Sequence, residues 1–137
     1  MAFMTYEGIR DNGTFKLDSG TKGKVASNPD VLVGKTVAFV NGTNGEPEVG
    51  YGTAKALMAG VVTAWEYADA NKNDIVVTVS RNCVFDNIST ASSSTTAAVG
   101  AGVVVDGKGG VETSTSASNA VCIALATAKT SCMIWVY

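Results

Sequence analysis

Histidine is absent from this sequence of 137 residues, and only two prolines occur. Without histidine the chain lacks the commonest general base and the commonest side-chain ligand of transition metals. Catalytic arrangements of the Ser–His–Asp or Cys–His type are therefore excluded. Glu46 and Glu48 flank a proline in a glycine-rich segment, where we expect both carboxylates to be solvated rather than held in an apolar catalytic pocket. The sequence thus predicts a protein that is not an enzyme and has no cofactor or metal.

Charge is also scarce, because Asp, Glu, Lys and Arg make up 16% of the chain and the net charge is −2. The ten Lys and Arg residues do not cluster. Binding to nucleic acid through phosphates requires a basic patch, so we predict no nucleic-acid partner. No stretch reaches the roughly 18 apolar residues of a membrane-spanning helix, and the first residues do not have the pattern of a signal peptide. We therefore expect no membrane partner.

Two other patterns predict structure rather than chemistry. The three cysteines, Cys83, Cys122 and Cys132, have no C-x-x-C spacing, so we interpret them as small core residues in a reducing compartment. The segment 69–74, DANKND, begins like a calcium-binding loop but lacks the glycine and the final glutamate of that motif. We expect it to be a polar hairpin connection instead.

Apolar and polar residues alternate with a period of two along most of the chain, which is typical of β-strands. The pattern predicts strands at 13–17, 35–41, 56–68, 74–85, 119–128 and 131–137, with a bend within the long segment 74–85. Segment 56–68 could also form a helix, but Gly60 and the branched residues after it favour a strand, with Leu57, Val61, Trp65 and Tyr67 on one face. Segment 119–128 is apolar on both faces, as in a strand covered on both sides. Asn-Gly, Asp-Gly and Gly-Gly turns separate these strands.

The sequence also contains a weak internal repeat. A shift of 65 residues places Val40-Asn41-Gly42 on Val105-Asp106-Gly107, and with one residue of slippage Val33-Gly34 corresponds to Val99-Gly100. This pattern indicates two related units of three strands each. Together these features predict an all-β fold, a small antiparallel β-barrel or β-sandwich.

We expect two parts in the chain. Residues 1–30 are rich in Gly, Ser and Asn and predict an extended N-terminal arm that a partner could order, while residues 31–137 predict the β-barrel domain. Trp65, Tyr67, Trp135 and Tyr137 lie near strand ends, where aromatic residues either fill a barrel or contact another subunit.

Residues 31–128 resemble the small decoration, or cement, proteins of tailed-bacteriophage capsids. The resemblance is carried by Gly and Val patterns in residues 34–40, 59–62, 75–79 and 100–111. It implies a β-barrel or β-sandwich homotrimer that binds the major capsid protein on the outer surface of the virion after assembly in the host cytoplasm. On this hypothesis the arm contacts the capsid through five apolar residues, and the four aromatic residues above form the subunit interface. The five are Phe3, Met4, Tyr6, Ile9 and Phe15.

Two other functions remain open. A carbohydrate- or receptor-binding β domain of a phage tail or adhesin could stack sugar rings on Trp65 and Trp135. A small hydrolase that uses carboxylates is the second alternative, although the chain has no paired-acid motif.

Overall fold

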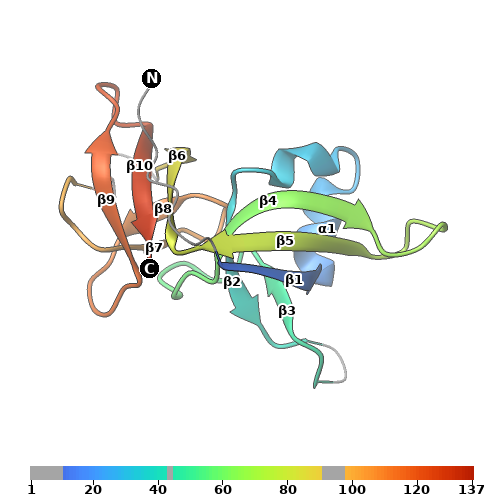
Figure 1. Cartoon of the computed structure of the whole chain (residues 1–137). Helices are drawn as coiled ribbons and strands as arrows, with labels where there is room; N and C mark the ends of the chain where they lie inside the picture. The colour runs from blue at the N-terminus through green and yellow to red at the C-terminus, as the bar shows by residue number, and fades with distance from the viewer. Residues whose placement is uncertain (1–10, 43–44, 91–97) are drawn as a thin grey trace.

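The computed structural model describes residues 11–42, 45–90 and 98–137, which form an all-β fold of two adjoining units (Figure 1). Unit 1 comprises residues 11–81 and unit 2 comprises residues 83–137. The elements of unit 1 are β1 (Asp11–Leu17), α1 (Ser19–Val25), the 3₁₀ helix η1 (Pro29–Leu32), β2 (Thr36–Val40), β3 (Glu48–Gly50), β4 (Gly60–Tyr67) and β5 (Ile75–Arg81). Those of unit 2 are β6 (Cys83–Ser89), β7 (Val103–Val105), β8 (Val111–Thr113), β9 (Ala120–Leu125) and β10 (Ser131–Val136).

Unit 1 is a closed barrel with the strand order β1-β3-β2-β4-β5. β1 closes it, since it pairs antiparallel with β5 on one side and parallel with β3 on the other. The expectation of an antiparallel barrel is therefore correct except for this one parallel pair. The core of the barrel is a cluster of buried apolar side chains that come only from unit 1, with Leu17, Val37, Val49 and Val77 near its centre.

Unit 2 has the same set of strand neighbours, with shorter pairings. It contains a three-stranded sheet, β6-β10-β9, and a hairpin of β7 and β8. Two single bridges connect the sheet to the hairpin: Thr90 pairs parallel with Val111, and Gly102 pairs antiparallel with Val121. Strands β6, β8, β7, β9 and β10 thus follow one another as β1, β3, β2, β4 and β5 do in unit 1.

The turns that precede β2 and β7 show that this correspondence extends to single residues. Gly34 and Gly100 both have φ of +87°. The amide of Gly34 donates to the carbonyl of Val62 in β4, and the amide of Gly100 donates to the carbonyl of Cys122 in β9, each at 2.8 Å. We call residues at matching positions of the two units counterparts.

The same irregularity occurs in both units. Thr63 is left unpaired between Val62 and Ala64 where β4 pairs with β5, and Ile123 is left unpaired at the matching point of β9 against β10. Such a β-bulge reverses the faces of the residues beyond it. Two identical turns and two identical bulges confirm the duplication that the sequence indicated. The prediction of three strands per unit was wrong, because each unit has five.

The shift of 65 residues was also wrong by one for β2 and β7. The shared turn aligns Gly34 with Gly100, a shift of 66, so the counterpart of Phe39 is Val105. A slip of one residue exchanges the two faces of a strand, so the sequence alignment paired inward residues with outward ones.

The units meet through side chains of unit 1 that complete the core of unit 2. Ala38, Met58 and Val61 belong to unit 1 yet pack in the apolar cluster of unit 2, against Val105 and Ile134 among others. Because the two single bridges close the strands of unit 2 into a ring, we also call unit 2 a barrel, and these three side chains cover the end of it that we call its mouth. Across this contact the Asn119 side chain accepts a hydrogen bond from the Met58 amide at 3.2 Å and donates one to the Met58 carbonyl at 2.6 Å.

The predicted arm over residues 1–30 is wrong for residues 11–30, which belong to the barrel of unit 1. β1 forms pairs on both edges, and α1 packs on the barrel with Thr21 and Val25 buried. Asp18 caps this helix by accepting a hydrogen bond from the Thr21 amide at 3.1 Å. Residues 1–10 lie outside the described residues.

The remaining strand predictions hold with three adjustments. The bend expected within residues 74–85 is confirmed, since β5 ends at Arg81 and β6 begins at Cys83 in the other unit. The segment 56–68 is a strand only from Gly60, and the bulge at Thr63 separates Val61, which faces unit 2, from Trp65 and Tyr67, which face the unit 1 core. β9 is not covered on both sides as expected, because Ile123 is exposed.

Candidate functional site

The two most buried carboxylates lie apart, one in each unit. Glu48 in β3 is only 4% exposed, so the expectation that it is solvated was wrong, while Glu46 is exposed as expected. The Glu48 carboxylate lies 4.0 Å from the Lys16 ammonium, and the buried Glu112 carboxylate in β8 lies 3.8 Å from that of Lys55. Each carboxylate is thus balanced by a lysine rather than paired with a second acid. Within residues 11–42, 45–90 and 98–137 no group of three or more Cys, Asp and Glu residues could hold a metal ion.

The three cysteines are buried thiols that form no disulfide with one another, as the sequence predicted. Burial, the adjacent Cys122 and the Asp86 carboxylate raise the pKa of the Cys132 thiol to about 12. Burial also raises the pKa of the Cys122 thiol. Both thiols therefore stay protonated near neutral pH, where a nucleophilic cysteine would need to be a thiolate.

Segment 69–74 is the hairpin connection between β4 and β5, as predicted, and the Asp69 carboxylate caps it by accepting a hydrogen bond from the Asn73 amide at 3.0 Å. No helix among the described residues is long and apolar enough to cross a membrane.

Trp65 and Tyr67, two of the four aromatic residues expected at a subunit interface, pack within unit 1. Both are half-buried against its core, with their rings 5.0 Å apart and edge to face. The Trp65 indole N–H donates to the Asp30 carboxylate at 2.9 Å, and the Lys72 ammonium lies 5.5 Å from the centre of the Tyr67 ring. The contacts of these two rings are thus with their own unit.

Trp135 and Tyr137, by contrast, are exposed at 47% and 55%. Their rings lie 6.0 Å apart at the C-terminal end of the chain. Trp135 stands directly between Val84 of β6 and Val121 of β9, both half-buried, on the outer face of the three-stranded sheet. We call Val84, Val121, Trp135 and Tyr137 the Trp135 face.

The counterpart of this face in unit 1 is polar and is covered at its centre. There Ser80 takes the position of Trp135 and is 0% exposed, between Val61 and Asn12. The Ser80 hydroxyl donates to the Asn12 side chain and lies 3.0 Å from the Thr63 hydroxyl. The barrel therefore does not require an aromatic residue at this position. Trp135 adds exposed apolar surface that the fold alone does not explain, and such surface is typical of contact sites.

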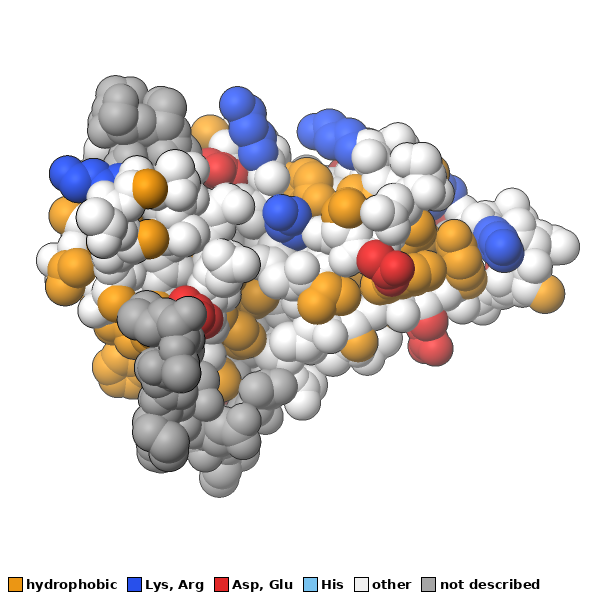
Figure 2. Space-filling view, turned by 90° about the horizontal axis from the view of Figure 1, so that it is seen from above, with side chains coloured by type: hydrophobic (Ala, Val, Ile, Leu, Met, Phe, Trp, Pro, Cys, Tyr) orange, Lys and Arg blue, Asp and Glu red, His pale blue; other side chains and the backbone are white. Residues whose placement is uncertain are grey.

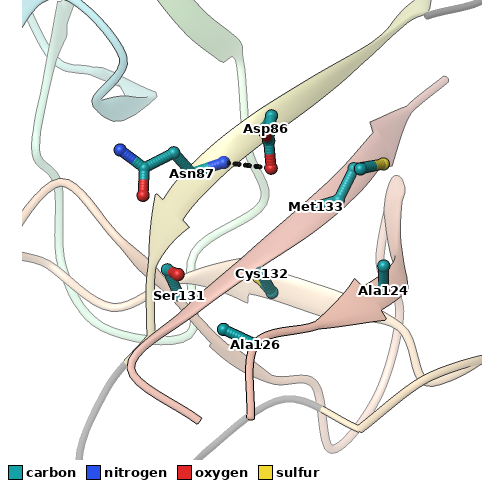
Figure 3. A pocket seen from close by; sticks show the side chains of 7 residues that line it. All are labelled: Asp86, Asn87, Ala124, Ala126, Ser131, Cys132 and Met133. Atoms are coloured by element: carbon teal, nitrogen blue, oxygen red, sulfur yellow. Dashed lines mark hydrogen bonds between the residues drawn. The ribbon is translucent and has the colours of Figure 1, made fainter. Parts of the chain in front are cut away.

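A shallow hollow lies beside the Trp135 face, further along β10 (Figure 3). Its volume is about 460 Å³, and it lies at the bulges of β6 and β9 against β10. Asp86 and Asn87 come from β6, Ser131 and Met133 from β10, and the Asp86 carboxylate accepts a hydrogen bond from the Asn87 amide at 2.7 Å. The remaining residues around it are Ala124, Ala126 and Cys132.

A second hollow, of about 320 Å³, opens at the end of the unit 1 barrel that corresponds to the covered mouth of unit 2. Phe39 lies in it, 58% exposed, with its ring 5.2 Å from that of Phe15 and edge to face. Val79 contributes to its wall, and the exposed Asp11 and Arg81 form its rim. Phe15, expected to contact a capsid, is thus half-buried at this open mouth of unit 1. The other four expected capsid contacts, Phe3, Met4, Tyr6 and Ile9, lie outside the described residues.

The surface charge is dispersed. Lys and Arg side chains stand singly on the face seen in Figure 2, with apolar side chains between them. Three of the four ion pairs among the described residues connect Lys16 or Lys22 to Glu48 or Asp74, at 3.8 to 4.0 Å. This face has no basic track of the kind that binds phosphates.

Comparison of the chain with protein-family models, with curated proteins and with solved structures found no match. The geometry of the two units is therefore what defines the candidate sites.

Sequence reasoning identified Trp135 and Tyr137 as candidates but missed both hollows. The sequence predicts only that Phe39 belongs to the strand 35–41, and nothing in the sequence shows that this end of the barrel is open. Alignment by the shared turn, which sets Phe39 against Val105 and Gly34 against Gly100, was the signal that could have found it.

Proposed function

We propose that this protein is a structural virion protein that decorates the head of a tailed bacteriophage. It binds the major capsid protein on the outer surface and associates with itself, as a homotrimer, without covalent chemistry. The observation that carries the proposal is the Trp135 face, an exposed aromatic surface at a position where the other unit of the same chain has a buried serine. The resemblance of residues 31–128 to decoration proteins supports the choice of partner.

The capsid contact is assigned to residues 1–10, which contain Phe3, Met4, Tyr6 and Ile9. The experiment mixes the purified protein with heads assembled from the major capsid protein encoded in the same genome and measures the bound fraction by co-sedimentation. Deletion of residues 2–10 should lower binding at least tenfold and leave the fold intact. The deletion must end at residue 10, because Asp11–Leu17 closes the barrel of unit 1. Full occupancy by the shortened chain would contradict the assignment, and no binding by the intact chain would contradict the proposed function.

Saccharide binding is a second candidate, favoured by the hollow beside the Trp135 face. An exposed indole offers a stacking surface, and Asp86, Asn87 and Ser131 nearby offer hydrogen-bond acceptors and donors for sugar hydroxyls. Titration with neutral oligosaccharides should then change the tryptophan fluorescence of the intact protein but not that of Trp135→Ser. Trp65 serves as the internal control, because its indole is bound to Asp30 in both proteins. An unchanged fluorescence would remove this candidate.

A further inference from the structure

The contact between the two units is of a head-to-tail kind. Unit 1 contributes an outer face, with Ala38, Met58 and Val61, and unit 2 contributes its mouth. The two surfaces are different, so this is a heterologous contact, which can be repeated between copies and can close into a ring.

Both units have the same fold, so each has a mouth and an outer face. The internal contact uses the outer face of unit 1 and the mouth of unit 2, which leaves the mouth of unit 1 and the outer face of unit 2 for other contacts. The mouth of unit 1, with Phe39 and Phe15, is open, whereas the mouth of unit 2 is covered. On the face of unit 2 that contains Val121, the counterpart of Val61, Val104 is buried but Trp135 is exposed, whereas Val61 and Ser80 on the same face of unit 1 are both covered. The molecule therefore has one apolar hollow and one apolar projecting face without partners among its described residues.

We infer that the Trp135 face of one copy docks on the open mouth of unit 1 of a second copy. This deepens the proposed self-association and rests on that part of the proposed function. Met58, the largest of the three unit 1 side chains at the internal contact, has Ser118 at the matching position of unit 2. A serine cannot fill an apolar hollow, and the indole of Trp135 provides the large apolar group instead.

Both surfaces carry charges at their edges, Asp11 and Arg81 at the open mouth and Asp86 beside the Trp135 face. Arg81 at the rim of the open mouth and Asp86 beside the Trp135 face are both exposed. Neither has an ion-pair partner within 4.0 Å among the residues that the structure describes. Because Asp11 and Arg81 have opposite charges, docking favours the orientation that sets Asp86 of one copy beside Arg81 of the other and away from Asp11.

The test uses one variant for each surface, in the full chain. Trp135→Ser introduces the residue of the counterpart position Ser80, and Phe39→Val introduces that of Val105. Each substitution thus introduces a residue that the other unit already has at the matching position. Val99→Ser, at a side chain that is 64% exposed and belongs to neither surface, is the control. Mass is measured by size-exclusion chromatography with light scattering at one protein concentration, and the fold of each variant is verified by circular dichroism.

We expect the native chain and Val99→Ser to assemble alike, with a mass near three chains, and each surface variant to be monomeric. An equimolar mixture of the two surface variants should form a species of two chains and nothing larger, because one intact mouth and one intact face remain. A native monomer, assembly of either variant like the native chain, or a mixture that stays monomeric would overturn the inference. A two-fold contact of the Trp135 face with itself would also overturn it, and would appear as assembly of Phe39→Val but not of Trp135→Ser.

Head binding distinguishes this inference from the proposed function. If the intact chain binds heads but Phe39→Val still assembles, only the head-to-tail contact is wrong. If the mixture behaves as expected but the intact chain does not bind heads, only the capsid partner is wrong.

Discussion

At the scale of single residues, the two units provide internal controls for one another. Ser80 and Trp135 occupy the same position of the same barrel, one with hydrogen-bonded neighbours and the other exposed. Gly34 and Gly100 are identical in residue and in φ. A residue that stays the same in both units is thus explained by the fold, and a residue that differs is explained by what surrounds its unit.

The paired glycines give a direct prediction. Replacement of Gly34 or of Gly100 by alanine should lower the free energy of unfolding by about 1 kcal/mol in each case, because an L residue is strained at positive φ. No heavy atom lies within 4 Å of the added methyl group at either site, so the loss reflects the backbone alone.

Gly23 in α1 is the matched control, since its added methyl group also meets nothing and its φ is not positive. Gly23→Ala should raise stability by about 0.5–1 kcal/mol through helix propensity. Urea unfolding of the three variants measures these effects. A loss at Gly34 without a similar loss at Gly100 would contradict the equivalence of the two turns.

The buried thiols predict a pH dependence at high pH. In the unfolded chain Cys122 and Cys132 ionise near pH 9, whereas the pKa of Cys132 in the folded chain is about 12 and that of Cys122 is also raised. The folded state holds these protons longer, so their stabilising contribution is complete below pH 9 and is lost as the pH rises toward 12.

Replacement of both cysteines by alanine should therefore make the fall in stability above pH 9 less steep than in the native chain. Tyrosine and lysine titrations are common to both proteins and cancel in the comparison. Urea unfolding at pH 8, 9.5 and 10.5 measures the two slopes, and equal slopes would show that the thiols ionise alike in both states.

At the scale of elements, strands were predictable and their faces were not. Alternation located β2, β5, β6 and β10 within a few residues, because side chains on opposite sides of a strand meet different surroundings. No feature of the sequence predicts the bulge at Thr63. Because of this bulge Trp65 faces the core of unit 1 and not the side on which Val61 lies.

The helix α1 escaped prediction for a different reason. Its seven residues, SGTKGKV, contain two glycines and little apolar periodicity, so local propensity argues against a helix. It forms because Asp18 caps its first turn and because Val25 is buried against the barrel. The aromatic candidates were predictable as a group, yet only the tertiary structure separates the packed pair, Trp65 and Tyr67, from the exposed pair.

At the scale of the whole molecule, the two barrels are not independent bodies. Met58 is 3% exposed and belongs to unit 1 in sequence but to unit 2 in packing. Met58→Ala should lower the free energy of unfolding by about 2–5 kcal/mol, because it leaves a cavity at the contact between the units.

The neighbouring Leu57, exposed at 53%, is the control, and Leu57→Ala should change stability by less than about 0.5 kcal/mol. Calorimetry should show one transition for the native chain, since the contact couples the units. Two separate transitions, with only one of them shifted by Met58→Ala, would show instead that the barrels unfold independently.

In apolar packing, unit 2 depends on unit 1 and not the reverse. The core of unit 1 is built from its own residues, while that of unit 2 includes three from unit 1. Because the ribosome releases the N-terminal residues first, the leading barrel can fold unaided, and it then serves as the template on which the trailing strands close. Residues 83–137 alone would lack part of their apolar core. Residues 11–81 alone would keep their own apolar core but would expose Met58 and Val61 and leave the Thr36 hydroxyl without the Gly110 carbonyl.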